Sequence, residues 1–184
     1  MLVFFVSCHG FVFGQEKNVS VITIEGADFT EYKKNKETNT EEIILTGNVT
    51  ISVKKDLKTS RVSADKVTYN RSTQMMYAVG NVSLVQTDSS EGEQRITATT
   101  LLLNTSTLEG IFDNGRAVQT QSNAINLPAD STLIVASRIF GRDNSSTIVF
   151  KNAELTFCDD ENPHWKIKAS KIWLLPGGEF AFLN

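Results

Sequence analysis

The feature that most constrains the fold is a short string that recurs along the chain with a nearly constant period. Each copy has an alanine, two further residues and then usually an apolar residue. The copies begin at Ala64, Ala98, Ala136 and Ala169, with a weaker one at Ala27. Successive alanines are 37, 34, 38 and 33 residues apart. A period in this range is typical of stacked structural repeats, so the sequence predicts a chain that repeats one unit.

A second string falls between the alanines and is most regular in its first two copies. These begin at Gly47 and Gly80 and read Gly-Asn-Val-Thr-Ile and Gly-Asn-Val-Ser-Leu, while weaker copies begin at Gly115 and Lys151. Residues 43–53, which contain the first copy, alternate almost perfectly between apolar and polar side chains. That alternation predicts a β-strand with one buried face.

The alternation changes phase at each alanine string. After Ala64, for example, the apolar set continues at Val67 and Tyr69, one residue out of step. Such a slip would turn the apolar face of a straight strand to solvent, so a bend or bulge is needed to keep it inward. The sequence therefore predicts a corner at each alanine string. Turns such as 70–73 and 104–107 are expected to join the strands.

The predicted fold class is all-β. We expect an open twisted β-jellyroll, in which stacked two-strand repeats form two facing antiparallel sheets around an apolar interior. The terminal strands of such a stack have unpaired backbone groups that a partner can use. The alternating segments 19–24 and 166–175 are therefore candidates for strand addition.

The inward-facing apolar residues have two interpretations. They form a sealed core, or they line a groove in which acyl chains are buried at about 0.8 kcal/mol per methylene. The candidate groove-lining residues are Val49, Ile51, Val53, Val67, Val82, Leu84, Leu101, Leu103, Ile139, Leu155, Phe157 and Ile172.

Composition and motifs exclude several classes of function. The net charge of −3 argues against a nucleic-acid binder, which usually has a basic domain. The sequence has no Cys-x-x-Cys, no glycine-rich phosphate loop and no Gly-x-Ser-x-Gly, so we predict neither an enzyme nor a cofactor. The acidic segment before His164 lacks the ligand spacing of an established cation site, which favours a solvated loop over a metal site.

Residues 1–14 differ from the rest of the chain because they are almost entirely apolar and contain no lysine or arginine. They predict a secretory signal that lacks its basic start, followed by a domain at 15–184. Lipidation at Cys8 is an alternative. Without the signal, Cys158 is the only cysteine. It is then either an inert thiol or the partner of a cysteine outside this domain.

Four Asn-x-Ser/Thr sequons, at Asn48, Asn70, Asn81 and Asn104, coincide with the repeat strings and the expected turns. We interpret them as turn and strand chemistry rather than as glycosylation sites.

Two stretches carry a resemblance to a known family. Residues 45–49 followed by 64–70 resemble the repeat of the OstA-like superfamily of lipopolysaccharide-assembly proteins. Residues 155–172 combine a cysteine, an acidic turn with a proline, a tryptophan and an Ala-Ser-Lys-Ile string. In this they resemble the N-terminal periplasmic domain of LptD, and residues 176–184 resemble the lead-in to its barrel.

The resemblance implies a function and partners. The domain would receive lipopolysaccharide, or a related glycolipid, from a periplasmic LptA-type bridge that adds to its N-terminal edge strand. It would pass the lipid to an outer-membrane barrel, which is not part of this chain and which pairs with an LptE-type lipoprotein. The domain would then lie on the periplasmic side of the outer membrane, and Cys158 matches a family cysteine that bonds to the barrel domain. The alternatives are a free LptA-type bridge and a structural β-solenoid without a lipid ligand.

Overall fold

The computed structural model describes residues 20–55, 58–88, 92–119, 132–143, 147–160, 162–175 and 180–183. The predicted signal at 1–14 and Cys8 lie outside the described residues. The described chain is all-β and forms an open twisted antiparallel sheet, which confirms the predicted fold class. Its strands are β1 (Val21–Gly26), β2 (Phe29–Asn35), β3 (Thr40–Lys55), β4 (Lys58–Asn70), β5 (Met75–Asp88), β6 (Gly92–Asn104), β7 (Gly110–Gln119), β8 (Leu133–Arg142), β9 (Ile148–Thr156), β10 (Ile167–Leu174) and β11 (Phe180–Leu183).

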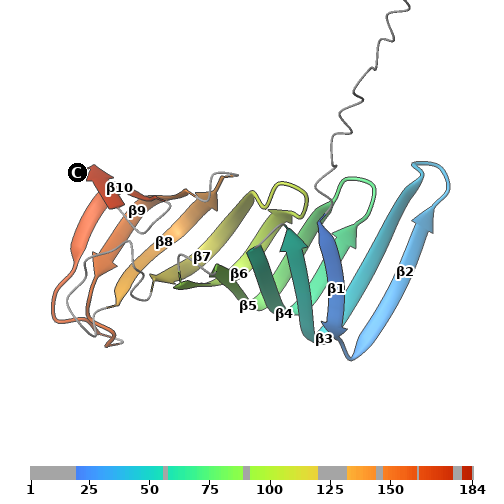
Figure 1. Ribbon diagram of the computed structural model, residues 1–184, viewed down its shortest axis with the longest axis horizontal. Helices are drawn as coiled ribbons and strands as arrows, with labels where there is room; N and C mark the ends of the chain where they lie inside the picture. Colours follow the sequence, from blue (N-terminus) through green and yellow to red (C-terminus); the bar gives the residue numbers. More distant parts are fainter. Residues whose placement is uncertain are drawn as a thin grey trace, which may run out of the picture.

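The strands follow one another along the sheet in the order of the sequence. The order is β1-β3-β4-β5-β6-β7-β8-β9-β10-β11, with β2 also paired to β3. Figure 1 shows this stack along the long axis of the molecule, with β1 and β2 at one end and β10 at the other. The sheet does not close into a barrel.

Corners divide each long strand, as the sequence predicts. The pairing of β3 with β4 shifts register between Thr46 and Val49, and the pairing of β5 with β6 shifts between Val79 and Val82. The corners split the sheet into two halves. The β1 half contains β1, 49–55 of β3 and 58–64 of β4, and the β2 half contains β2, 40–46 of β3 and 66–70 of β4. The two predicted sheets are thus halves of one bent sheet.

The second repeat string builds the corner because its glycine and asparagine adopt positive φ angles. Gly80 has φ +76°, and a Cβ at this position would lie 2.3 Å from the Oδ2 atom of Asp65. Asn81, at φ +46°, donates from Nδ2 to both carboxylate oxygens of Asp65 at 3.0 and 3.2 Å. One repeat earlier, Asp28 makes the corresponding contacts with Gly47 and Asn48. Two of the four sequons therefore have a structural role at corners.

The other two sequons begin the turns between strands. The Oδ1 atom of Asn70 accepts hydrogen bonds from the backbone N–H groups of Ser72 and Thr73, both at 3.0 Å. Asn104 makes the same Asx turn one repeat later. Asparagine is favoured here because its side chain replaces a backbone acceptor in a tight turn.

Apolar side chains from both halves form one core. Its largest fully buried members include three phenylalanines, Phe112, Phe140 and Phe150, on the adjacent strands β7, β8 and β9. The ring centroids are 4.8 Å apart for Phe112 and Phe140 and 4.9 Å apart for Phe140 and Phe150. The interior near the C-terminal strands is therefore filled by stacked rings.

Strand β8 departs from the predicted phase by one residue. Ser137, rather than Ala136, takes the buried corner position, and its Oγ lies 2.6 Å from the carbonyl oxygen of Lys151. That contact satisfies the hydroxyl and allows serine to replace alanine. Phe140 then continues the inward face, while Ile139 is 49% exposed on the outer face. The prediction that Ile139 faces the interior is therefore wrong.

The expected C-terminal edge also differs. The segment 166–175 forms β10, which pairs with β9 on one side and with β11 on the other. It is not a terminal strand, because residues 180–183 return to pair with it.

Candidate functional site

At the N-terminal end of the stack, the β2 half extends beyond the cover of the β1 half. All seven residues of β2 are exposed. Among the described residues, β2 pairs only with β3, and Phe29 and Tyr32 are 76% and 53% exposed. Both faces of β2 are therefore uncovered, and the interior is accessible from this end.

A cavity of about 270 Å³ lies at this opening, and we call it the mouth cavity. Ile22 and Ile24 of β1 line it on one side, and Ile43 and Leu45 of β3 line it from the other half of the sheet. The remaining lining residues are Ser20, Ile51, Tyr69 and Arg71. Leu45 and Ile51 also belong to the buried core, so core side chains form part of the cavity wall.

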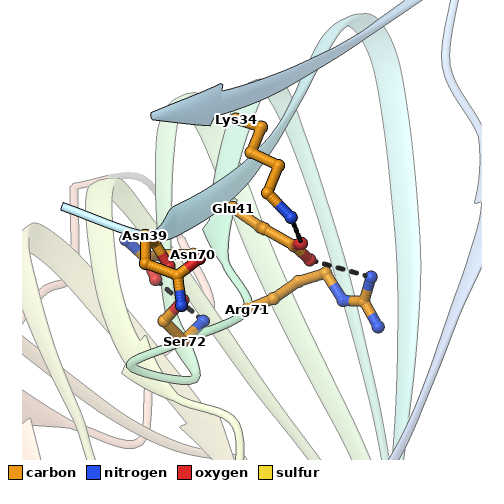
Figure 2. Close-up of polar contacts among 6 residues, drawn as sticks. All are labelled: Lys34, Asn39, Glu41, Asn70, Arg71 and Ser72. Atoms are coloured by element: carbon orange, nitrogen blue, oxygen red, sulfur yellow. Dashed lines mark hydrogen bonds and ion pairs between the residues drawn. The ribbon is translucent and has the colours of Figure 1, made fainter. Parts of the chain in front are cut away.

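Four polar residues border the mouth cavity: Tyr32, Lys34, Glu41 and Arg71. We call them the rim cluster. Glu41 lies at its centre (Figure 2): its Oε1 is 2.9 Å from the Nζ of Lys34 and its Oε2 is 3.3 Å from the Nη1 of Arg71. The hydroxyl of Tyr32 also hydrogen-bonds to this carboxylate. Because Arg71 lines the cavity and contacts Glu41, the rim cluster and the cavity form one site.

The contacts in the rim cluster shift the pKa of three of its members. The hydrogen bonds from Lys34 and Tyr32 lower the pKa of Glu41. The hydrogen bond to Glu41 raises the pKa of Lys34. Partial desolvation, followed by the contact with Glu41, raises the pKa of Tyr32. At neutral pH, the cluster therefore holds two cations and one carboxylate.

Away from the mouth, the described residues fill and bridge the interior. In addition to the stacked phenylalanines, the Arg142 Nη1 donates to the Oε1 of Gln86, and both residues are buried. Gln86 lies in the β1 half of β5 and Arg142 in the β2 half of β8, so this hydrogen bond joins the two halves across the interior.

The structure places most of the predicted groove-lining residues in the sealed core rather than at an opening. The buried ones, each at most 2% exposed, are Val49, Ile51, Val53, Val67, Val82, Leu84, Leu101, Leu103, Leu155 and Ile172. Phe157 is half-buried and packs against the core. Of these residues only Ile51 lines the mouth cavity. Whether the others contact lipid stays a prediction.

Sequence reasoning missed most of the mouth. The alternation placed Ile43, Leu45 and Tyr69 on the apolar face, but none of them was among the predicted groove-lining residues. No sequence pattern joins Lys34, Glu41 and Arg71, which come together only through strand pairing.

Cys158 lies apart from the mouth. It is a free, half-buried thiol whose Sγ is 3.7 Å from the Nδ1 of His164. It also lines an outer-face pocket of about 300 Å³ with Glu154 and Lys166, which form an ion pair at 2.7 Å. Within the described ranges, no group of three or more His, Cys, Asp or Glu residues could hold a metal ion.

The fold and the mouth define a class of protein: an open β-jellyroll with an apolar cavity at its N-terminal end. A protein-family model described as "Lipopolysaccharide-assembly, LptC-related" matches residues 22–110, which contain the mouth cavity's β1, β3 and β4 residues and the rim cluster. No curated protein matches the sequence. In the part of the chain that the structure describes, no helix is long and apolar enough to span a membrane.

The family match confirms the broad part of the sequence interpretation, which is a relation to lipopolysaccharide-assembly proteins. The matched segment is related to LptC, and this family implies a role in lipopolysaccharide transport in the cell envelope. It is a transport family, which confirms the prediction that the protein is not an enzyme. The narrower resemblance to LptD stays a prediction, because it depends on residues 155–172, outside the match.

Proposed function

We propose that this protein carries lipopolysaccharide, or a related glycolipid, with the acyl chains held between the two halves of the sheet at the mouth. The observation that supports this function is the mouth cavity, because mostly apolar residues of both halves line it and two of them belong to the core. Each buried methylene contributes about 0.8 kcal/mol, so six methylenes contribute about 5 kcal/mol before the cost of immobilising the lipid.

The N-terminal edge is the proposed docking site for a periplasmic LptA-type bridge. Among the described residues, β1 and β2 each pair only with β3, so both have one free edge. Exposed apolar side chains lie on both strands, including Val21 and Phe29. A partner strand that paired with this edge would continue the sheet and place its own interior against the mouth.

The finer role we propose is that of an LptD-type domain on the periplasmic side of the outer membrane, which passes lipid from the bridge to a barrel and its LptE-type lipoprotein. Residues 155–172 support it through their resemblance to that domain. The half-buried thiol of Cys158 could then bond to a cysteine of the barrel domain. A free LptA-type bridge is the second candidate, and the open N-terminal edge favours it equally.

Site-specific photocrosslinking tests lipid binding. A photoreactive residue at Ile43, which is half-buried in the mouth, should capture lipopolysaccharide in cells. The same residue at Leu102, which is 39% exposed on the outer face, is the matched control. Equal capture at both positions, or none at Ile43 in a folded protein, would refute the proposal.

Thiol labelling tests the finer role. In the full-length protein isolated from membranes without reductant, Cys158 should resist alkylation until a reductant is added, and a Cys158→Ser variant should lose the difference in gel mobility between the non-reduced and the reduced protein. Complete alkylation of Cys158 without reductant would eliminate the disulfide and favour the free bridge.

A further inference from the structure

The rim cluster has the features of a headgroup site beside an acyl-chain cavity. Arg71 is the one charged residue among those that line the mouth cavity, and Lys34 lies across the inner face of the sheet from it, on the other side of Glu41. A ligand whose chain enters the cavity would therefore place its polar end among these side chains.

Both cations keep donors available for a ligand. The guanidinium of Arg71 has five N–H groups and contacts Glu41 through one nitrogen, and Lys34 makes one such contact with its three ammonium protons. Their side chains are 58% and 51% exposed. An incoming anion could bind them on the solvent side without displacing Glu41.

Backbone and turn contacts hold the turn that carries Arg71 in place. The backbone N–H of Arg71 donates to the carbonyl oxygen of Glu41 at 2.9 Å. The hydroxyl of Ser72 donates to the carbonyl oxygen of Asn39 at 3.4 Å and joins the two turns (Figure 2). Because these contacts fix the turn that carries Arg71, the cost of ordering its side chain on binding is reduced.

We infer that Lys34 and Arg71 bind the phosphate of an amphiphile whose acyl chain occupies the mouth cavity, with Glu41 as the residue that positions both cations. This inference depends on the proposed function, because it assumes that the mouth takes an acyl chain. A planar guanidinium and an ammonium together match the oxygens of a phosphate. The two cations and one carboxylate give the rim cluster one net positive charge, which attracts the phosphate.

Three probes separate the headgroup from the chain: dodecyl phosphate, dodecyl maltoside with the same chain and a neutral headgroup, and inorganic phosphate. Displacement of an apolar fluorescent dye from the full chain measures binding of the two dodecyl compounds, and inorganic phosphate is added as a competitor of dodecyl phosphate. Dodecyl phosphate should bind about tenfold more tightly than dodecyl maltoside, a difference of about 1.4 kcal/mol. This preference should decrease as salt is added, because the cations are exposed.

Charge variants assign the preference to residues. The double variant Lys34→Gln/Arg71→Gln should lose the preference for dodecyl phosphate, so that its affinities for the two dodecyl compounds become equal. Lys33→Gln/Arg61→Gln makes the same change in net charge at cations that pair with Glu31 and Glu25. It should keep the preference, and Lys34→Arg/Arg71→Lys should retain most of it.

The outcomes distinguish this inference from the proposed function. If neither dodecyl compound displaces the dye, the acyl-chain proposal fails. If both displace it equally well and Lys34→Gln/Arg71→Gln changes nothing, only the headgroup inference fails. It also fails if the control variant has the same effect, or if inorganic phosphate competes as well as dodecyl phosphate, since the site would then bind free anions.

Discussion

Replacing Gly80 with alanine should destabilise the fold by about 2–3 kcal/mol. At φ +76°, an L-residue costs about 1–2 kcal/mol in backbone strain. The new Cβ would also lie 2.3 Å from the Oδ2 of Asp65. The carboxylate must then rotate away and lose its hydrogen bonds with Asn81, which together contribute about 1 kcal/mol at this exposed site.

A double-mutant cycle tests the cause of this loss. Asp65→Ala alone should cost about 1 kcal/mol, because it removes the same hydrogen bonds. The double variant Gly80→Ala/Asp65→Ala should cost no more than Gly80→Ala, which gives a coupling of about 1 kcal/mol between the two sites. Urea denaturation followed by circular dichroism provides the free energies of unfolding.

Gly141→Ala is the matched control. Gly141 has an ordinary φ, and a Cβ there would lie 3.4 Å from the nearest atom, the carbonyl oxygen of Gly110. Alanine should therefore be neutral or stabilise the strand by up to about 1 kcal/mol. Strictly additive effects of Gly80→Ala and Asp65→Ala would contradict the contact between these residues and the account of the corner.

Three further changes test other parts of the structure. Phe140→Ala should cost about 3–5 kcal/mol in urea denaturation, whereas Ile111→Ala, at an outer position, should cost less than about 1 kcal/mol; similar losses would contradict the filled interior. Because the folded state lowers the pKa of Glu41, its contacts stabilise the protein above the ordinary glutamate pKa and are lost as pH falls through the lowered value. Melting temperatures measured across this range should therefore decrease less in Glu41→Gln than in the parent, and parallel curves would exclude the effect. Asn104→Ala should lower stability by about 1 kcal/mol in thermal unfolding through loss of the Asx turn, and an unchanged melting temperature would show that the turn does not need it.

The corners could be predicted from the sequence because their causes are local. A phase change in a two-residue alternation requires a bulge wherever it occurs, so Ala64 identified a corner without knowledge of its neighbours. The asparagine turns are equally local, because the side chain of Asn70 bonds to residues two and three positions later.

The error in β8 shows how the repeat can mislead. Ala136 fits the string, but the buried place belongs to Ser137, whose hydroxyl finds a carbonyl partner on the next strand. Because Ala136 matches the repeat string, the sequence had favoured it as the buried corner residue. The position of Phe140 between two other rings favours the observed phase, and that stacking depends on neighbouring strands.

The mouth could not be predicted from the sequence for a different reason. It depends on how the two halves of the bent sheet lie relative to one another at β1, β2 and β3, which no local pattern of residues encodes. The rim cluster depends on the pairing of β2 with β3 and of β3 with β4, because these bring Lys34, Glu41 and Arg71 to one face.

The order of strands in this sheet also affects how such a protein can change in size. From β4 to β11, each strand pairs, among the described residues, only with its immediate neighbours in the sequence. Duplication or loss of a two-strand unit within this region would lengthen or shorten the molecule by about 10 Å without breaking any other pairing. In a barrel the same event would destroy closure. In stacked repeats, folding can begin in any unit and spread to the next. The length of the molecule could therefore change during evolution by one two-strand unit at a time, while the opening at β1 and β2 stays unchanged.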